Sequence, residues 1–284
     1  MNHLITVQNW RSVVVSVLLL ILVSAIYLSE SLKPTETFRV TFFDVGQGDA
    51  ALYQTPKNLK ILIDGGVDNK ILNHLGKHLS FLDNEIDMVV ATHDDADHIF
   101  GLIKVLEKYR VKVLFVSLPN SKNEIMQKII EIANKRNVKV VTIDKPSIVN
   151  TEDGVIIKFL FPTINLDGVD DGNNASVVTQ VIYKGSGGDV KILSTGDLGV
   201  GGEKYLVSVY GDDLRSNILK LGHHGSDTST SPEFLQKVKP EVAIVSAGRN
   251  NKFGHPHQSV LDLLSKFNIE VRQTNQEGNI YFEF

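Results

Sequence analysis

The sequence predicts an α/β protein, and three observations support this class. Short runs rich in Val, Ile and Leu, which suit buried strands, alternate with longer segments whose apolar residues recur at helical spacing. After the first 35 or so residues, roughly 250 remain, enough for one domain with a substantial core. Polar clusters follow several strand-like runs, as in layered α/β proteins whose strand ends share one rim.

The elements are expected in alternating order along the chain. Strands are predicted at 38–44, 50–54, 59–64, 87–92, 111–117, 138–143, 155–161, 177–184, 189–195, 216–221, 241–246, 269–273 and 279–283, where apolar and β-branched residues gather. Helices are predicted at 69–79, 98–109, 122–136, 202–209, 231–237 and 257–267. Because strands precede or follow helices throughout, helices should cover the sheets.

The N-terminal segment is predicted to be a membrane anchor or a signal sequence. The stretch 12–28 has no charged residue and is long enough, at about 25 Å, to be near the lower limit for crossing a bilayer. Arg11 precedes it, which favours a single-pass anchor with the following domain outside the cytoplasmic membrane. Cleavage near Ala25 would instead release a secreted protein. The predicted division is 1–30 as anchor or signal sequence, 31–37 as linker and 38–284 as the α/β domain.

Composition narrows the chemistry that the chain can carry. Its 42% hydrophobic and 22% charged residues are ordinary for a globular protein, and its net charge of −4 gives no overall reason to bind nucleic acid. Because the chain has no cysteine, any metal must be held by His, Asp and water. The segment Gly46-Gln47-Gly48 lacks the Lys-Ser/Thr of a phosphate-binding loop, so no nucleotide cofactor is expected.

The segment His93-Asp94-Asp95-Ala96-Asp97-His98 concentrates potential metal ligands. It follows the strand-like run 88–92, and a helical pattern starts at Asp97. Side chains on such a strand-to-helix turn can converge on one point, and His with carboxylate suits divalent transition metals. A polar loop with a capping Asp is the alternative, and the clusters that follow argue against it.

Three further clusters each follow a probable strand. They are Thr195-Gly196-Asp197, Gly222-His223-His224-Gly225-Ser226 and Gly254-His255-Pro256-His257. Together with the first segment they contain six of the nine histidines, which scattered surface histidines would not do. The sequence therefore predicts one shared site on a sheet rim.

Seven motifs in this order resemble those of the metallo-β-lactamase superfamily, and more closely the hydrolase domain of the ComEC/Rec2 competence proteins. The motifs are Phe43–Ala50, Leu62–Gly66, Thr92–His98, Asn173–Ser176, Thr195–Asp197, His223–Ser226 and Gly254–His257, spanning about residues 39–284. The resemblance implies a four-layer αββα sandwich with metal ions at one sheet edge.

The resemblance also implies two divalent ions, Zn²⁺ or Mn²⁺, and a set of ligands for each ion. The implied ligands are His93 and Asp95 for the first ion, Asp97, His98 and His223 for the second, and Asp197 as the bridge. His224 would then contact the substrate or support a ligand, although the order of His223 and His224 stays open. Asp95 stands where most of the superfamily has His, and a third His for the first ion has no match. Oxygen-rich sites favour harder ions, so Mn²⁺ or Mg²⁺ becomes plausible beside Zn²⁺.

Several residues have both a functional and a structural interpretation. Asp97, His224 and His255 are candidates for catalysis, and His257 for a substrate contact or a helix N-cap. Asp64 could hydrogen-bond a ligating His or simply sit in a turn. The remaining candidates for supporting the site or contacting substrate are Asp44, Gln47, Asp49, Asn174, Ser176 and Ser226. His74 and His78, at helical spacing, are interpreted as a solvated helix face, and Arg249 and Lys252 as surface charges that could hold a phosphate.

The expected reaction is hydrolysis by a metal-bound hydroxide. The resemblance implies a phosphodiester substrate, most of all DNA during uptake. The alternatives are another phosphodiester outside the cytoplasm, such as a cell-wall polymer or a small molecule, and a metal-binding module without catalysis.

Overall fold

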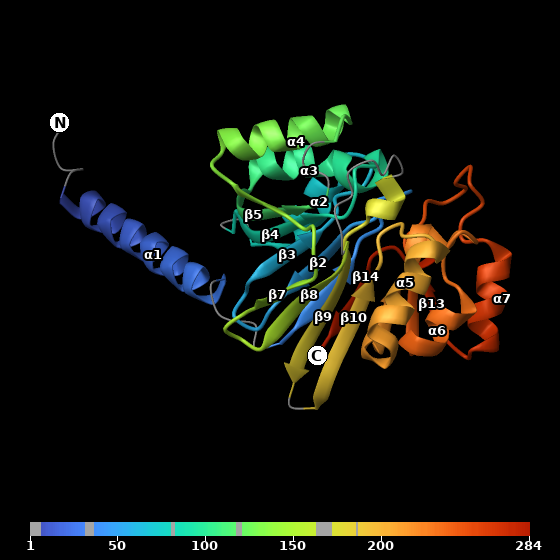
Figure 1. Cartoon of the computed structure of the whole chain (residues 1–284). Helices are drawn as coiled ribbons and strands as arrows, with labels where there is room; N and C mark the ends of the chain where they lie inside the picture. The colour runs from blue at the N-terminus through green and yellow to red at the C-terminus, as the bar shows by residue number, and fades with distance from the viewer. Residues whose placement is uncertain (1–6, 32–36, 81–82, 118–120, 163–171, 186) are drawn as a thin grey trace.

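Two seven-stranded sheets stack face to face between two layers of helices in the computed structural model of the protein (Figure 1). The structure describes residues 7–31, 37–80, 83–117, 121–162, 172–185 and 187–284. The predicted α/β class is confirmed, and the sheets begin at Arg39 and end at Glu283, within the predicted domain 38–284.

The first sheet has the order β14-β1-β2-β3-β4-β5-β6. Its strands are β1 (Arg39–Phe42), β2 (Ala51–Gln54), β3 (Lys60–Ile63), β4 (Glu85–Ala91), β5 (Arg110–Val116), β6 (Lys139–Thr142) and β14 (Ile280–Glu283). The strands β3 to β6 run parallel, whereas β14, β1, β2 and β3 pair antiparallel. Its outer face packs against α2 (Lys70–His78), α3 (Ala96–Lys108) and α4 (Glu124–Lys135) (Figure 1).

The second sheet has the order β13-β12-β11-β10-β9-β8-β7. Its strands are β7 (Ser147–Asn150), β8 (Val155–Phe161), β9 (Val178–Gly185), β10 (Gly188–Ser194), β11 (Ile218–Lys220), β12 (Val242–Val245) and β13 (Glu270–Gln273). The strands β10 to β13 are parallel and the others antiparallel. The helices α5 (Val200–Tyr210), α6 (Pro232–Val238) and α7 (Gln258–Lys266) cover it (Figure 1).

Short helical segments connect these elements. They are the 3-10 turns η1 (Gly172–Ala175), η2 (Gly211–Leu214) and η3 (Gly222–Gly225), and the short helix α8 (Thr274–Glu277).

The core consists of three apolar layers, because each sheet presents side chains to both of its faces. In β2, Tyr53 points into the layer between the sheets while its neighbour Leu52 packs under α2 and α3. This alternation is the two-residue period of a strand. Both faces of both sheets are therefore buried, which is why the strands read as nearly continuous apolar runs.

Apart from the three 3-10 turns, one strand and one helix were not predicted. Strand β7 contains only two apolar residues, lies at the edge of its sheet and leaves Ile148 59% exposed, so it lacks the signal of a buried strand. Helix α8 is a single polar turn, Thr274–Glu277, with no apolar periodicity to reveal it.

The N-terminal segment forms α1 (Val7–Ser31), a helix of 25 residues that lies apart from the sandwich (Figure 1). A bilayer requires roughly 20 consecutive apolar residues. Over the described parts of the chain, none of the helices has both the length and the apolar character of a membrane span. The predicted transmembrane anchor at 12–28 is therefore not supported. The predicted linker, 31–37, falls mostly outside the described residues.

Candidate metal centre

The predicted site residues meet at one edge of the sandwich, where strands of both sheets end. His93 follows β4, Asp197 follows β10, and His223 and His224 follow β11. His255 lies on the loop between β12 and α7. Because these loops leave their strands on the same side, segments far apart in the sequence contribute to a single cluster.

The inner part of the cluster contains Asp197, His98, His224 and Asp97. The Nε2 atom of His98 lies 3.2 Å from Asp197 Oδ1. The Nε2 atom of His224 lies 3.4 Å from Asp197 Oδ2 and 3.2 Å from Asp97 Oδ2. Two imidazoles thus meet at the Asp197 carboxylate, and Asp97 joins the group through its contact with His224. Such a combination of His and Asp suits a divalent ion.

A second group lies against the same carboxylate. His93 Nε2 is 3.7 Å from Asp95 Oδ2 and 3.9 Å from Asp197 Oδ2. His223 Nε2 is 3.8 Å from Asp197 Oδ2. The structure thus brings all six predicted ligands together, with Asp197 between the two groups.

The buried histidines use their two ring nitrogens differently. The outer nitrogen, Nδ1, contacts a neighbouring residue in each ring. In His93 it lies 3.0 Å from Thr92 Oγ1, and in His98 it lies 2.8 Å from Asp64 Oδ2. In His224 it lies 3.2 Å from Asp49 Oδ1 and 3.0 Å from the Ser246 carbonyl. The inner nitrogen, Nε2, is buried in all three rings and makes no hydrogen bond among the described residues. Asp197 Oδ1 is likewise buried and makes no hydrogen bond among the described residues, although His98 Nε2 lies at ion-pair distance. Buried polar atoms rarely go without a hydrogen bond, and bound metal ions would satisfy these four.

The charges of the cluster also fit a cation. Burial disfavours the imidazolium of His98, but the carboxylates of Asp197 and Asp64 outweigh it and hold its pKa well above the usual value. Burial is likewise outweighed at His224, where Asp197 and Asp49 raise the pKa to about 9. Burial, with His98 nearby, lowers the pKa of His93 to about 3. Without a metal, protons on His98 and His224 balance the carboxylates, and a divalent ion would replace them.

The geometry favours His224 over His223 as the inner ligand, the reverse of the predicted order. The prediction assumed an extended segment, in which neighbouring side chains point apart. Instead both residues have positive φ angles, 47° and 56°, inside η3. The His224 side chain is only 2% exposed, whereas that of His223 is 28% exposed, and His223 Nδ1 contacts Thr228 Oγ1 at 3.0 Å.

Asp49 approaches the cluster, but both of its oxygens are already engaged. One ligand atom each from Asp49, His98, Asp197 and His224 lies within 4.8 Å of the others. However, Asp49 Oδ1 contacts His224 Nδ1, and Asp49 Oδ2 lies 2.5 Å from Lys220 Nζ. We therefore assign Asp49 to holding His224 in place, in agreement with its predicted supporting role.

Lys220 is a functional residue that the sequence analysis missed. It ends β11, is only 3% exposed, and also donates a hydrogen bond from Nζ to the Leu221 carbonyl at 2.8 Å. Within the apolar run 217–221 it looked like an ordinary strand residue. The signal that could have found it is its position three residues before the paired histidines.

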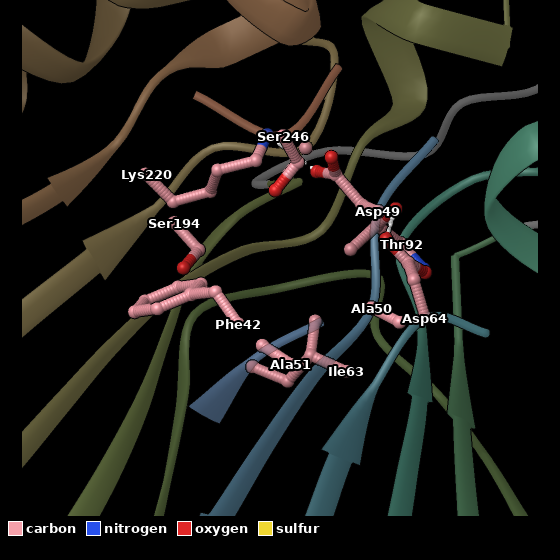
Figure 2. A pocket seen from close by; sticks show the side chains of 11 residues that line it. Phe42, Asp49, Ala50, Ala51, Ile63, Asp64, Thr92, Ser194, Lys220 and Ser246 are labelled. Carbon is pink, nitrogen blue, oxygen red and sulfur yellow. Dashed lines mark hydrogen bonds and ion pairs between the residues drawn. The ribbon is translucent and has the colours of Figure 1, made fainter. Parts of the chain in front are cut away.

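A small cavity lies next to the residues that support the proposed ligands, among them Asp49, Asp64 and Thr92 (Figure 2). Its volume of about 10 Å³ is close to that needed for one water molecule. Figure 2 shows Ser194 and Lys220 on one side and Thr92 and Asp64 on the other. The polar groups that orient the ligands therefore line one shared interior space.

Three other predicted residues support the centre directly. Asp64, with a φ of 59°, accepts hydrogen bonds from the Thr92 amide and contacts His98 Nδ1. Ser176 Oγ accepts a hydrogen bond from the Asp197 amide at 3.0 Å. The ring of His255 lies 5.5 Å from that of His223, and its buried Nδ1 atom has no partner among the described residues.

The remaining predicted residues shape loops around the centre. Asp44 Oδ1 accepts a hydrogen bond from the Gly46 amide, and Gln47 Oε1 accepts one from the Gly248 amide at 3.1 Å. Ser226 Oγ accepts from the Thr228 hydroxyl, and Asn174 lies exposed on η1. His257 occupies the N-cap position of α7, but its side chain does not cap the helix and contacts Asp227 instead.

His74 and His78 lie outside the centre, as predicted, but they do not form a solvated face. Their rings pack against Phe43 at 5.1 and 5.0 Å. His74 Nε2 also contacts the Asp44 carbonyl at 3.0 Å. Both histidines are half-buried because α2 packs its end against the first turn of the domain.

Comparisons with known proteins agree with this architecture. Residues 43–118 match the metallo-beta-lactamase superfamily. The chain is 32% identical over 269 residues to ComE operon protein 3 of Bacillus subtilis (strain 168), covering 86% of this chain and 33% of that protein. It is 31% identical over 250 residues to competence protein ComA of Neisseria gonorrhoeae, covering 88% of this chain and 33% of that protein. The chain thus spans about a third of the length of these relatives.

A solved structure shares the fold. It is Igni18, a metallo hydrolase from the hyperthermophilic archaeon Ignicoccus hospitalis KIN4/I, with a TM-score of 0.55 at 16% identity, covering 87% of this chain and 99% of that one.

Proposed function

Because this chain belongs to the metallo-β-lactamase superfamily, we propose that it is a metal-dependent phosphodiesterase that cleaves DNA. The observation that supports metal binding most is the set of buried Nε2 atoms of His93, His98 and His224 that surround Asp197 without a hydrogen bond among the described residues. A domain that binds no metal would have no need to bury so many ligand atoms without hydrogen bonds at one point.

The proposed centre would hold two divalent ions, Zn²⁺ or Mn²⁺. Asp97, His98 and His224 would hold one and His93, Asp95 and His223 the other, with Asp197 available to both. When bound, such a pair supplies hydroxide at neutral pH and neutralises the charge that develops on a phosphate. The carboxylate of Asp95 adds oxygen to its group, which favours Mn²⁺ there.

The residues of the chain then have distinct tasks. Asp64 and Asp49 fix the rings of His98 and His224, so that Nε2 of each faces the centre. His255, whose ring lies beside those of His223 and His224, is placed to hydrogen-bond an oxygen of the substrate. Burial, together with His224 and His223, lowers the pKa of His255 to about 4, so its ring is neutral.

DNA is the proposed substrate because the relatives that match most of this chain are competence proteins. The net charge of −4 provides no broad basic surface for a DNA backbone, so binding must be local. The same acidic charge favours the second candidate, a small or cell-wall phosphodiester, whose binding needs no such surface.

The test uses the purified chain of 284 residues, stripped of metal and resupplied with Mn²⁺ or Zn²⁺. We expect restored hydrolysis of both single-stranded DNA and bis-p-nitrophenyl phosphate, and loss of both in Asp197→Ala and Asp97→Ala. The control His78→Ala should retain turnover. Full activity without metal would overturn the mechanism, and cleavage of bis-p-nitrophenyl phosphate alone would favour the second candidate.

We further propose that the domain acts outside the cytoplasm. The support is the uncharged stretch 12–28 after Arg11, a pattern of exported proteins. Protease added to intact spheroplasts should then digest the domain, whereas digestion only after lysis would place it inside.

A further inference from the structure

Phe253 is a large apolar side chain left 50% exposed beside the metal centre. It lies on the loop between β12 and α7. One face of its ring stacks on His255, with 5.6 Å between the ring centroids and 21° between the planes. His255 in turn lies 5.5 Å from His223 and 6.1 Å from His224. A row of rings therefore leads from the surface to the proposed ligands.

The loop holds this ring in a fixed place. Asn251 Oδ1 accepts hydrogen bonds from the amides of Phe253 at 3.1 Å and His255 at 3.0 Å. Asn251 Nδ2 donates to the carbonyls of Gly248 at 3.0 Å and His255 at 2.6 Å. Because one side chain makes four bonds across the loop, the backbone that carries the exposed ring is held in place, which lowers the entropic cost of binding a ligand.

A cation covers part of the same ring. Lys252 Nζ lies over the ring of Phe253, 5.0 Å from its centroid. Lys252 is itself exposed, so its ammonium can turn from the ring toward a nearby phosphate. An exposed aromatic ring with an adjacent cation is the combination with which proteins bind single-stranded nucleic acid.

We propose that Phe253 is a stacking platform for an unpaired nucleobase that flanks the phosphodiester at the metal centre, and that Lys252 binds the adjoining phosphate. This inference rests on the proposed function and assigns its substrate to single-stranded nucleic acid. Stacking on an aromatic face needs little positive charge and tolerates any base. It therefore explains how a chain of net charge −4 can hold DNA without a basic track.

Binding can be tested separately from cleavage. The chain has one tryptophan, Trp10, which lies on α1. The double variant Trp10→Phe, Phe253→Trp thus carries its single tryptophan at the platform, and tryptophan can be excited selectively at about 295 nm or above. We expect oligothymidylate to quench this fluorescence, and the same oligonucleotide made wholly of abasic sites to quench it much less. Equal quenching by both, or none by either, would overturn the platform.

Cleavage supplies a second test with a matched control. Tyr281 is 55% exposed and stacks on His78, 5.5 Å away, outside the metal centre. In Phe253→Leu, kcat/KM for single-stranded DNA relative to that for bis-p-nitrophenyl phosphate should fall by about tenfold, as expected for the loss of one base stack. In Tyr281→Leu this ratio should stay unchanged.

The outcomes separate the two proposals. If the ratio falls equally in both variants, or in neither, the platform is wrong although the phosphodiesterase can stand. If the metal-loaded wild type cleaves no phosphodiester, the proposed function fails, while quenching at position 253 still decides whether a base stacks there.

Discussion

Each buried histidine of the metal centre depends on a neighbour that fixes its ring. His98 is the clearest case, because Asp64 contacts its Nδ1 atom at 2.8 Å and also accepts a hydrogen bond from the Thr92 hydroxyl at 2.8 Å. Asp64 is only 1% exposed, so no water can replace it easily. The sequence allowed two interpretations of this residue, a turn and a ligand support. The structure shows both, because Asp64 has the positive φ of a turn residue, 59°, and its carboxylate contacts His98.

Asp64→Asn should weaken metal binding by about 10- to 100-fold, the usual effect of removing a carboxylate that orients a ligating His. The matched control is Asp44→Asn, because Asp44 Oδ1 bonds only the nearby Gly46 amide among the described residues. Competition of both variants with a chelating dye measures the dissociation constant. Equal affinity in wild type and Asp64→Asn would show that Asp64 acts only in the turn.

Lys220 carries a buried charge that the fold must balance. Its Nζ atom lies 2.5 Å from Asp49 Oδ2, and both side chains are less than a tenth exposed. Lys220→Met removes the ammonium that lies against the buried Asp49 carboxylate, so it should destabilise the fold by about 3–5 kcal/mol. Urea unfolding measures this change.

Two variants check that interpretation. Lys112→Met removes an exposed lysine that pairs with Glu85 and Asp87, and should cost only about 0–1 kcal/mol. Adding Asp49→Asn to Lys220→Met should recover much of the lost stability, because it removes the buried carboxylate charge that the lysine had balanced. A double variant no more stable than Lys220→Met would contradict the charge argument.

At the scale of elements, the strands and long helices were predictable because burial imposes a clear apolar pattern. The predicted strand at 87–92 is β4 (Glu85–Ala91), and the predicted helix at 122–136 is α4 (Glu124–Lys135). Local backbone geometry was not predictable in this way. The left-handed turn η3 reverses the order of His223 and His224, and no apolar pattern encodes it. Lys220 was missed for a related reason, since its partner Asp49 lies far away in the sequence, on the loop between β1 and β2 of the other sheet.

Contacts between elements also place Asp97. Gly48, on the loop between β1 and β2, has a φ of 122°, and a Cβ there would lie 2.0 Å from the Asp97 carbonyl oxygen. The Asp49 amide donates to the same carbonyl at 3.2 Å. The loop and the first turn of α3 can therefore approach only because residue 48 lacks a side chain.

Gly48→Ala should displace both Asp49 and Asp97, and so lower turnover and stability together. We expect a loss of at least about 1–3 kcal/mol, the range for a strained backbone position. The control Gly76→Ala lies in α2 with open space around it, and should stabilise the protein by up to about 1 kcal/mol. Turnover and urea unfolding of both variants give the measurement. Unchanged turnover in Gly48→Ala would mean that the loop does not position Asp97.

At the scale of the whole molecule, the metal centre joins the two sheets, because its ligands come from loops of both. His93 and His98 follow β4 of the first sheet, whereas Asp197 and His224 follow β10 and β11 of the second. An ion bound there therefore links the two halves of the sandwich in the folded state only. Mass action then stabilises the fold, by about 4 kcal/mol at a thousandfold excess of metal over its dissociation constant. Chelation should accordingly lower the Tm.

The stability of the metal-free protein should depend on pH in a way that the metal-loaded protein does not. The pKa of His224 is raised from 6.5 to about 9, so its protonated form stabilises the metal-free fold. This contribution is complete below pH 6.5 and is lost as the pH rises through about 9. In the loaded protein the metal takes the place of the proton on His224. The gap in Tm between loaded and metal-free protein should therefore widen from pH 6.5 to 9, as thermal unfolding with and without chelator can measure. A gap that narrowed over this range would show that metal and proton do not compete for His224.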